Sequence, residues 1–177
     1  MKNHEDLIWI TQVLLWNDER AFERLMKKYL PQIRRYFLIQ TKGNDATSDD
    51  LTQETFIKAW QGLKRFKQLS SFGTWLYRIA FNVYMTYATK KETPQSIDNC
   101  TTLQVAYNET HETTDIEELQ KAIYRLSDKE RQCITLFYLQ EMKIREINKV
   151  TGWNIGTIKS HLSRGRKNLE KILKNNE

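Results

Sequence analysis

The sequence predicts an all-α protein of two small helical domains, an N-terminal bundle and a C-terminal helical domain, joined by a flexible linker. Only 6 Gly and 2 Pro occur among the 177 residues, which favours long helices over many turns. Apolar residues recur three and four positions apart in the first ninety and the last sixty residues, and nothing reads as a strand pair. Residues 92–115 lack this period and are rich in Thr, Asn, Gln and acids, as linkers are. The domains are therefore expected at residues 1–91 and 116–177.

The composition predicts a cytoplasmic protein. No apolar run approaches the roughly 18 residues that a membrane span needs, so no direct membrane insertion is expected. The first six residues are polar, which argues against secretion. Cys100 and Cys133 lack metal-ligand or redox spacing, and both are expected to stay reduced. No phosphate loop, nucleophile elbow or zinc motif is present, so neither a cofactor nor an enzyme activity is expected.

The charge changes sign twice along the chain. Residues 1–91 contain 15 Lys and Arg against 9 Asp and Glu, residues 92–124 contain 1 against 7, and residues 125–177 contain 12 against 6. The outer segments therefore each carry a net charge of +6 and the middle one −6. Two basic blocks separated by an acidic strip suggest two modules that bind a polyanion.

Two helices are predicted at the start of the first domain. The first spans residues 5–16, with Leu7, Ile8, Ile10, Thr11, Leu14 and Leu15 on a helical period. The second spans residues 19–39, and Asn17 or Asp18 can cap it. Pro31 removes one backbone donor from this helix and is expected to kink or split it.

A third helix is predicted over residues 48–62, capped by Thr47 or Ser48. The apolar side chains expected to face the core are Leu51, Phe56, Ile57 and Trp60. Its first turn carries an acidic patch of Asp49, Asp50 and Glu54. This patch could form a magnesium site with further oxygen ligands, stabilise the helix dipole, or dock a basic partner.

A fourth helix is predicted to start at Ser70 or Ser71 and to end near residue 90, after a basic connector over residues 63–69. Its six aromatic side chains are Phe72, Trp75, Tyr77, Phe81, Tyr84 and Tyr87. Trp75, Leu76, Ile79 and Val83 are expected in the core, which leaves Phe72, Tyr84 and Tyr87 for a ligand. Aromatic faces can hold unstacked bases while nearby cations hold phosphates, so an opened DNA strand is the predicted ligand. Core packing alone is the alternative for the apolar positions.

The second domain begins with a helix from residue 116, whose Leu119, Ile123 and Leu126 share a face. Ser127 and Glu130 have the spacing of a capping box. The helix that follows is expected to end near residue 140. It should bury Cys133, Ile134, Phe137 and Tyr138.

Residues 144–162 have the spacing of a helix-turn-helix. A short helix over residues 143–151 precedes Gly152, which can adopt the left-handed turn, and Asn154 can cap a last helix over residues 155–173. The side chains that this last helix would present to a major groove are Thr157, Lys159, Ser160, His161, Ser163, Arg164 and Arg166. The alternative is an ordinary helical hairpin with a solvated polar face.

At three of these blocks the chain resembles a bacterial extracytoplasmic-function (ECF) sigma factor of the sigma-70 family. Residues 50–60, DLTQETFIKAW, look like the helix of that family that binds core RNA polymerase. Residues 72–82, FGTWLYRIAFN, look like its promoter-melting segment, and residues 155–167 look like its recognition helix. The resemblance implies a subunit of RNA polymerase that recognises promoter DNA and carries no catalysis of its own.

The resemblance also implies partners and site residues. The clamp coiled coil of core polymerase would contact Asp49, Asp50, Gln53, Glu54, Phe56 and Trp60. The −10 element would contact Lys67, Ser70, Ser71, Phe72, Trp75, Arg78, Asn82, Lys90 and Lys91. The −35 element would contact Asn154, Thr157, Lys159, Ser160, His161, Arg164, Arg166 and Lys167. The second domain would also rest on the flap of the polymerase, and an anti-sigma factor, commonly membrane-anchored in this family, would hold both domains inactive.

Two other functions compete with this interpretation. A helix-turn-helix repressor or activator with an N-terminal sensing bundle would bind duplex DNA without polymerase. An all-helical metal hydrolase would use Asp49, Asp50 and Glu54 and would turn over nucleotides only with metal.

Overall fold

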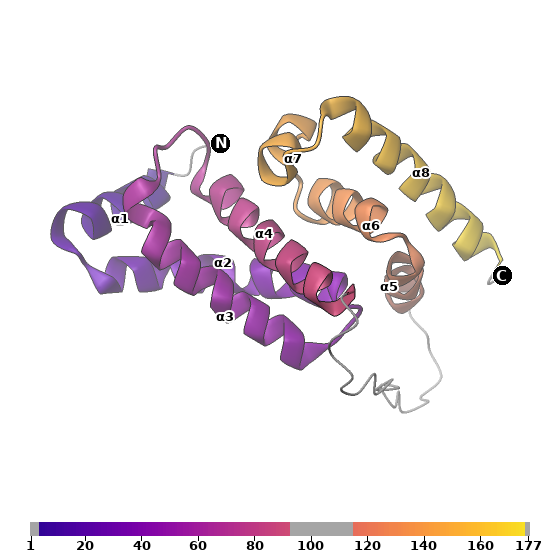
Figure 1. The fold of residues 1–177 in the computed structure, drawn as a ribbon, viewed down its shortest axis with the longest axis horizontal. Helices are drawn as coiled ribbons and strands as arrows, with labels where there is room; N and C mark the ends of the chain where they lie inside the picture. The colour runs from indigo at the N-terminus through magenta and orange to yellow at the C-terminus, as the bar shows by residue number, and fades with distance from the viewer. Residues whose placement is uncertain (1–3, 93–114, 176–177) are drawn as a thin grey trace.

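The computed structural model describes residues 4–92 and 115–175, and within these ranges the ordered elements are helices. The predicted all-α class is confirmed. Residues 93–114 of the predicted linker, which include Cys100, lie outside the described residues, whereas Glu92 and Asp115 at its ends belong to helices. The ribbon shows one group of helices formed by α1 to α4 and a second formed by α5 to α8 (Figure 1).

The first domain contains four α-helices and a short 3₁₀ turn. These are α1 (His4–Trp16), α2 (Glu19–Gln40), α3 (Asp45–Gly62), η1 (Leu63–Arg65) and α4 (Phe72–Glu92). The buried side chains Leu25, Ile33 and Phe37 of α2 and Leu76 of α4 contribute to the core between them. The α3 helix packs against both α2 and α4, and α1 packs against α2.

The caps of the first domain follow local side-chain chemistry. Asp18 accepts hydrogen bonds from the amides of Arg20 and Ala21, at 2.9 and 3.3 Å, so one of the two predicted caps of α2 is confirmed. The predicted cap of α3 at Thr47 or Ser48 is wrong, because Asn44 caps this helix instead. The Ser48 hydroxyl lies inside the helix and donates to the Asn44 carbonyl at 2.6 Å.

The helix α2 runs unbroken through Pro31, so the predicted split does not occur. The Pro31 side chain is exposed at the surface. The predicted core face of α1 is also partly wrong. Ile10 and Val13 are buried, whereas Ile8 is 53% and Leu15 is 68% exposed. The α1 helix is therefore held to α2 by fewer apolar residues than its periodicity indicates.

Polar contacts also hold the start of α1 against α2. The buried Asp6 carboxylate accepts a hydrogen bond from the Tyr29 hydroxyl at 2.6 Å and pairs with Lys28 at 2.6 Å. Burial, reinforced by the hydrogen bond to this carboxylate, raises the pKa of the Tyr29 phenol above its ordinary value. The phenol is therefore a proton donor at every physiological pH, and it keeps the start of α1 on α2.

The second domain consists of α5 (Asp115–Arg125), α6 (Asp128–Ile134), a π-helical turn η2 (Thr135–Leu139), α7 (Ile144–Thr151) and α8 (Ile155–Lys174). The predicted capping box at Ser127 and Glu130 is confirmed. Cys133 and Ile134 are buried as expected, whereas Tyr138 is exposed.

The two domains pack against each other along α4, which lies between α3 on one side and α7 on the other (Figure 1). The Tyr36 hydroxyl donates to the side-chain oxygen of Gln132 at 2.6 Å, and both groups are buried. The Gln40 amide donates to the Thr135 hydroxyl at 3.2 Å. The described conformation is therefore closed, with hydrogen bonds that cross from one domain to the other.

Contacts both within the first domain and between the domains explain the many aromatic residues of α4. Phe72 and Tyr84 are buried, contrary to the prediction that they face a ligand. Tyr77 donates a hydrogen bond to Gln140, and Phe81 packs edge-on against Trp153 with ring centroids 5.6 Å apart. The helix needs aromatic side chains on more than one face because it borders both domains.

Candidate nucleic-acid interface

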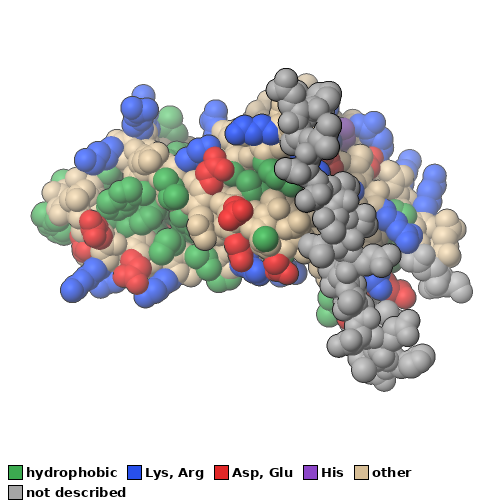
Figure 2. Space-filling view, turned by 60° about the horizontal axis from the view of Figure 1, so that its bottom comes forward, with side chains coloured by type: hydrophobic (Ala, Val, Ile, Leu, Met, Phe, Trp, Pro, Cys, Tyr) green, Lys and Arg blue, Asp and Glu red, His purple; other side chains and the backbone are tan. Residues whose placement is uncertain are grey.

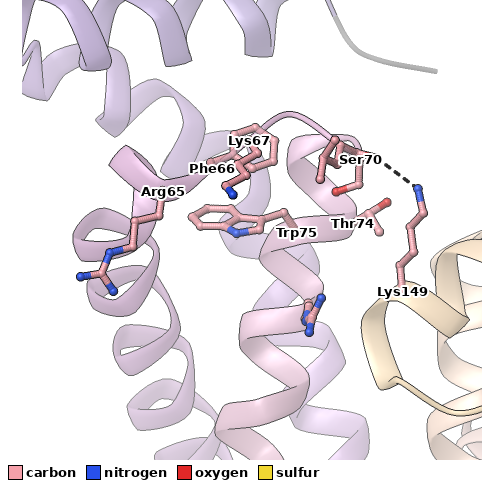
Figure 3. Close-up of a pocket in the computed structure, with 9 residues that line it drawn as sticks. Arg65, Phe66, Lys67, Ser70, Thr74, Trp75 and Lys149 are labelled. Carbon is pink, nitrogen blue, oxygen red and sulfur yellow. Dashed lines mark hydrogen bonds between the residues drawn. The ribbon is translucent and has the colours of Figure 1, made fainter.

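A pocket of about 350 Å³ opens at the beginning of α4 (Figure 3). Most of its walls come from the segment between η1 and α4 and from the first turns of α4 itself. The residues that line it are Arg65, Phe66, Lys67, Leu69, Ser70, Thr74, Trp75, Arg78 and Lys149. Four of the predicted −10 contacts line the pocket: Lys67, Ser70, Trp75 and Arg78. A fifth, Ser71, lies next to the pocket.

Local packing fixes the shape of this pocket. The buried Phe66 ring lies against Trp75 with centroids 5.0 Å apart, which anchors the segment before α4. At the other end, the Ser71 hydroxyl accepts a hydrogen bond from the Thr74 amide at 3.1 Å and so acts as the cap of α4. One of the two predicted starts of this helix is therefore confirmed, and the Ser71 hydroxyl is engaged in the cap.

The pocket combines an aromatic wall with positive charge. Trp75 is only partly buried, so it can offer its ring to a ligand, whereas the buried Phe72 lies beneath it at 5.6 Å between centroids. Arg65, Lys67 and Arg78 are exposed around the opening, and the described residues that line it include no Asp or Glu. Such a site suits a planar base attached to phosphates.

Three further predicted −10 contacts lie along the rest of α4. Asn82 is exposed in the middle of the helix, and Lys90 and Lys91 lie in its last turn. They do not line the pocket, but they continue its polar and basic character along the same helix. A strand that leaves the pocket along α4 would meet these side chains in turn.

The helix-turn-helix of the second domain has the predicted geometry. Gly152 adopts a φ of +74°, the left-handed conformation that a Cβ disfavours, and its amide donates to the Asn148 carbonyl at 2.9 Å. The Asn148 side chain donates to the Trp153 carbonyl at 2.8 Å and so supports the same turn. Asn154 accepts a hydrogen bond from the Thr157 amide at 2.8 Å. Its side chain therefore serves as the cap of α8.

The exposed face of α8 carries the predicted −35 contacts. Lys159, Ser160, Arg164, Arg166 and Lys167 are exposed, and Thr157 and His161 are partly buried. These side chains therefore lie where a DNA groove could meet them, whereas Ile158 and Leu162 hold the opposite face of the helix in the core.

His161 has a structural partner as well as an exposed edge. Its ring lies 5.6 Å from the Trp153 ring, and its Nδ1 accepts a hydrogen bond from the Arg164 guanidinium at 3.2 Å. Partial burial, together with the charges of Arg164 and Lys129, lowers the pKa of the imidazole. His161 is therefore a neutral polar contact at neutral pH and adds no further cation to α8.

The α8 helix approaches α6 closely at Gly165. A Cβ built on Gly165 would lie 2.9 Å from Cγ1 of Ile134, closer than side chains tolerate. Glycine in a helix interior costs about 1 kcal/mol relative to alanine, so its presence here reflects the need for contact between the two helices. This contact fixes the direction in which Arg164 and Arg166 leave the domain.

An apolar groove of about 360 Å³ lies between α2 and α3. Its lining residues are Phe22, Met26, Leu30, Thr52, Gln53, Phe56, Ile57 and Trp60. Figure 2 shows hydrophobic side chains gathered over this part of the first domain, with acidic and basic side chains around them. Three of the predicted polymerase contacts, Gln53, Phe56 and Trp60, belong to the groove.

Ile57 is the groove residue whose exposure the sequence reasoning missed. It was expected to face the core, but its side chain is 57% exposed. Phe56 is buried beneath it, and Trp60 packs edge-on against Phe22 at 4.9 Å. A side chain with this exposure on a continuous apolar surface is typical of a protein-binding site. The helical spacing of Ile57 could not show whether its side chain faces the core or an uncovered groove.

The acidic patch beside the groove is partly neutralised within the domain. Asp49 pairs with Arg34 at 2.6 Å, and Glu54 pairs with Lys58 at 2.6 Å. Asp50 is exposed. Within residues 4–92 and 115–175, no group of three His, Cys, Asp or Glu side chains could hold a metal ion. The same ranges contain no helix long and apolar enough to cross a membrane.

The fold and these surfaces define a two-domain helical protein with a helix-turn-helix at its C-terminal end. Residues 25–93 match the family model of sigma-70 region 2, and residues 116–169 match that of sigma-70 region 4. The two matches together cover more than half of the chain. The chain belongs to the sigma-70 family, and its relatives place it among the ECF sigma factors.

Several curated relatives are similar over most of their length. The RNA polymerase sigma factor YlaC of Bacillus subtilis is 29% identical over 158 residues, which cover 85% of this chain and 91% of YlaC. The ECF RNA polymerase sigma factor SigW of the same organism is 29% identical over 175 residues, which cover 89% of this chain and 91% of SigW.

Solved structures share the fold. The sigma factor RpoE of Bartonella quintana, solved in complex with the anti-sigma factor NepR, superimposes with a TM-score of 0.71. It is 24% identical, over 88% of this chain and 98% of that one. CnrH, solved with the cytosolic domain of CnrY, gives a TM-score of 0.69 at 24% identity, over 98% of this chain and 99% of that one.

Proposed function

We propose that this chain directs core RNA polymerase to promoters in the cytoplasm by reading a −35 element as duplex and a −10 element as opened strand. The observation that carries this proposal is the presence of two DNA-suited surfaces on separate domains. One is the cationic pocket with the Trp75 wall, and the other is the exposed basic face of α8. The membership of the ECF group supports the same function over a repressor or a hydrolase.

The pocket in the first domain receives a flipped base of the −10 element. A base that leaves the duplex loses about a few kcal/mol of stacking, which a fitted pocket and an aromatic wall can offset. Trp75 supplies this wall, Ser70 supplies a polar contact, and Arg78 lies where it can hold a phosphate. Asn82, Lys90 and Lys91 then guide the strand along α4.

The second domain reads the −35 element with α8. Arg164 and Lys159 are the exposed side chains best suited to guanine edges in the major groove. Arg166 and Lys167 hold phosphates and thereby fix the register of the helix.

The apolar groove between α2 and α3 receives the clamp coiled coil of core polymerase. Ile57 and Trp60 provide the apolar contacts, and Asp50 and Gln53 provide polar contacts at the rim. The flap of the polymerase would rest on the second domain. An anti-sigma factor that covers the same groove would keep the chain from the polymerase, and no catalytic step belongs to the chain itself.

In the closed conformation the second domain lies against the −10 pocket. The Lys149 ammonium lies 3.2 Å from the Leu69 carbonyl beside the pocket, and Trp153 contacts Phe81. We infer that the two domains part when the chain joins polymerase, so that the pocket and α8 can each reach their own promoter element.

Run-off transcription tests the proposed function. The purified chain is added to bare core polymerase on a library of random templates, and specific transcripts are sequenced. We expect initiation at templates that share two elements at fixed spacing. Duplex binding without polymerase and no specific transcript from any template would instead favour the repressor alternative.

Arg164→Ala is expected to reduce discrimination between the best −35 element and its point variants by about tenfold, because one base contact in the major groove is lost. The measurement is transcription by the reconstituted holoenzyme on promoters that differ at single −35 positions. Lys174→Ala is the control, since Lys174 is exposed at the end of α8, where it pairs with Glu170. Equal losses on all promoters would assign Arg164 to phosphate contact only.

Resonance energy transfer between two dyes can measure the separation of the domains. The dyes are attached to cysteines introduced by Lys64→Cys and Lys171→Cys, and Cys100→Ser removes a native thiol that would also be labelled. Cys133 does not compete for the dyes, because burial raises the pKa of its thiol to about 12 and the group is inaccessible. Transfer is expected to fall from its value in the free chain when core polymerase binds. Unchanged transfer in an active holoenzyme would contradict the opening.

A further inference from the structure

Leu69 stands out at the rim of the pocket. Its side chain is 82% exposed, the largest value among the exposed large hydrophobic residues of the described chain. A single exposed leucine is ordinary on a protein surface. Leu69, however, lines the pocket that we assign to a flipped base and directly precedes Ser70.

The backbone around Leu69 is held in a defined shape. Gln68 adopts a φ of +55°, in the left-handed region that side chains other than glycine disfavour. The segment is anchored before this point by the buried Phe66 and after it by the Ser71 cap of α4. Because both ends are fixed and the turn lies between them, Leu69 is presented outward on a short and constrained loop.

The surroundings of Leu69 are those of a nucleic-acid surface. Arg65, Lys67 and Arg78 line the same pocket, and Trp75 forms its wall. Lys149 of α7 reaches across to the Leu69 carbonyl, as the dashed line in Figure 3 shows. An apolar tip surrounded by cations is poorly suited to bind an apolar protein surface, but it suits the space between stacked bases within a charged backbone.

We propose that Leu69 is a wedge that enters the base stack of the −10 element where the captured base has left it. This inference rests on the proposed function, since it concerns the same pocket. When a base turns out of a duplex, its neighbours lose a stacking partner, and apolar side chains such as leucine can occupy the gap. Leu69 and Ser70 both line the pocket, so a single loop supplies both the receptor for the base and the replacement for it.

The wedge acts on strand opening and not on recognition of the already opened strand. Removal of the side chain should therefore slow the step in which the duplex opens. Binding of core polymerase should be unaffected, because Leu69 lies outside the α2–α3 groove. A larger or more flexible apolar side chain should retain the function, whereas a small polar one should not.

The test uses holoenzymes reconstituted from core polymerase and the full chain carrying Leu69→Ser or Leu69→Met. Opening is followed with a fluorescent base analogue in the −10 element of a duplex promoter. Leu69→Ser is expected to slow opening about tenfold, and Leu69→Met is expected to stay within about twofold of the wild type. Leu15→Ser is the matched control, because Leu15 is a similarly exposed leucine on α1, and it should leave the rate unchanged.

A template with an unpaired −10 element completes the test. On this template Leu69→Ser should initiate as fast as the wild type, since no stack remains to be wedged. Three results would overturn the proposed wedge. Leu69→Ser could open the duplex as fast as the wild type, it could lose equally on both templates, or it could bind core polymerase more weakly. Failure of the wild-type holoenzyme on every template would instead count against the proposed function.

Discussion

Ile57→Asp is expected to weaken binding to core RNA polymerase by about 100-fold, which corresponds to about 2.7 kcal/mol. Ile57 is 57% exposed on the α2–α3 groove, so its replacement leaves the core of the domain intact. In the complex, however, an aspartate would be removed from water against apolar side chains with no cation to pair with. Central apolar contacts of this kind often dominate the energy of an interface. The measurement is a titration of labelled chain with core polymerase.

Ile8→Asp is the matched control for this prediction. Ile8 is 53% exposed, but it lies on α1 outside the groove, so the same substitution should leave the affinity unchanged. Thermal unfolding of both variants should resemble that of the wild type. An affinity of Ile57→Asp within threefold of the wild type would remove the groove from the polymerase-binding surface.

Gly165→Val is expected to lower the free energy of unfolding by about 3 kcal/mol, at the upper end of the usual cost of overpacking. Even a Cβ at this position would lie 2.9 Å from Cγ1 and 3.2 Å from Cδ1 of Ile134. The Ile134 side chain is itself buried, so it has little space into which to move. The two helices must then separate, which also turns α8 away from its DNA-reading direction. Urea unfolding followed by circular dichroism measures the loss.

Gly156→Val, in the same helix, provides the comparison. Gly156 is exposed in the first turn of α8, and a Cβ there would meet only the Asn154 side-chain oxygen, at an ordinary distance of 3.5 Å. Its effect on the free energy of unfolding should stay within about 0.5 kcal/mol. If both variants were equally stable, the close approach of α8 to α6 would not constrain the domain.

Local chemistry explains which parts of the fold could be predicted. The capping box at Ser127, the left-handed Gly152 and the cap at Asn154 each depend on residues within a few positions of one another, and all three are confirmed. The prediction of the α3 cap was wrong for a local reason as well. Asn44 and Ser48 both carry capping side chains, and only the folded loop selects the first.

The residues whose burial or exposure was predicted wrongly depend on contacts with parts of the molecule that are distant in sequence. Phe72 and Tyr84 are buried because α4 has neighbours on several faces, and Ile57 is exposed because its groove has no partner within the described chain. The helical period identifies the apolar face of a helix, but it does not show which surface covers that face. The contact between Tyr36 and Gln132 joins residues 96 positions apart, and no short pattern predicts it.

The boundary between the domains includes polar groups beside the aromatic contact of Phe81 with Trp153, and these polar groups affect how the molecule can work repeatedly. The groups that meet there include the phenol of Tyr36, the amides of Gln40 and Gln132 and the hydroxyl of Thr135. Each of these groups can exchange its partner for water, so a hydrogen bond of this kind contributes only about 1 kcal/mol net. A boundary made of aliphatic side chains alone would adhere more strongly and would expose an aggregation-prone surface on release. In the proposed opening, hydration of these polar groups offsets part of the cost of parting the domains.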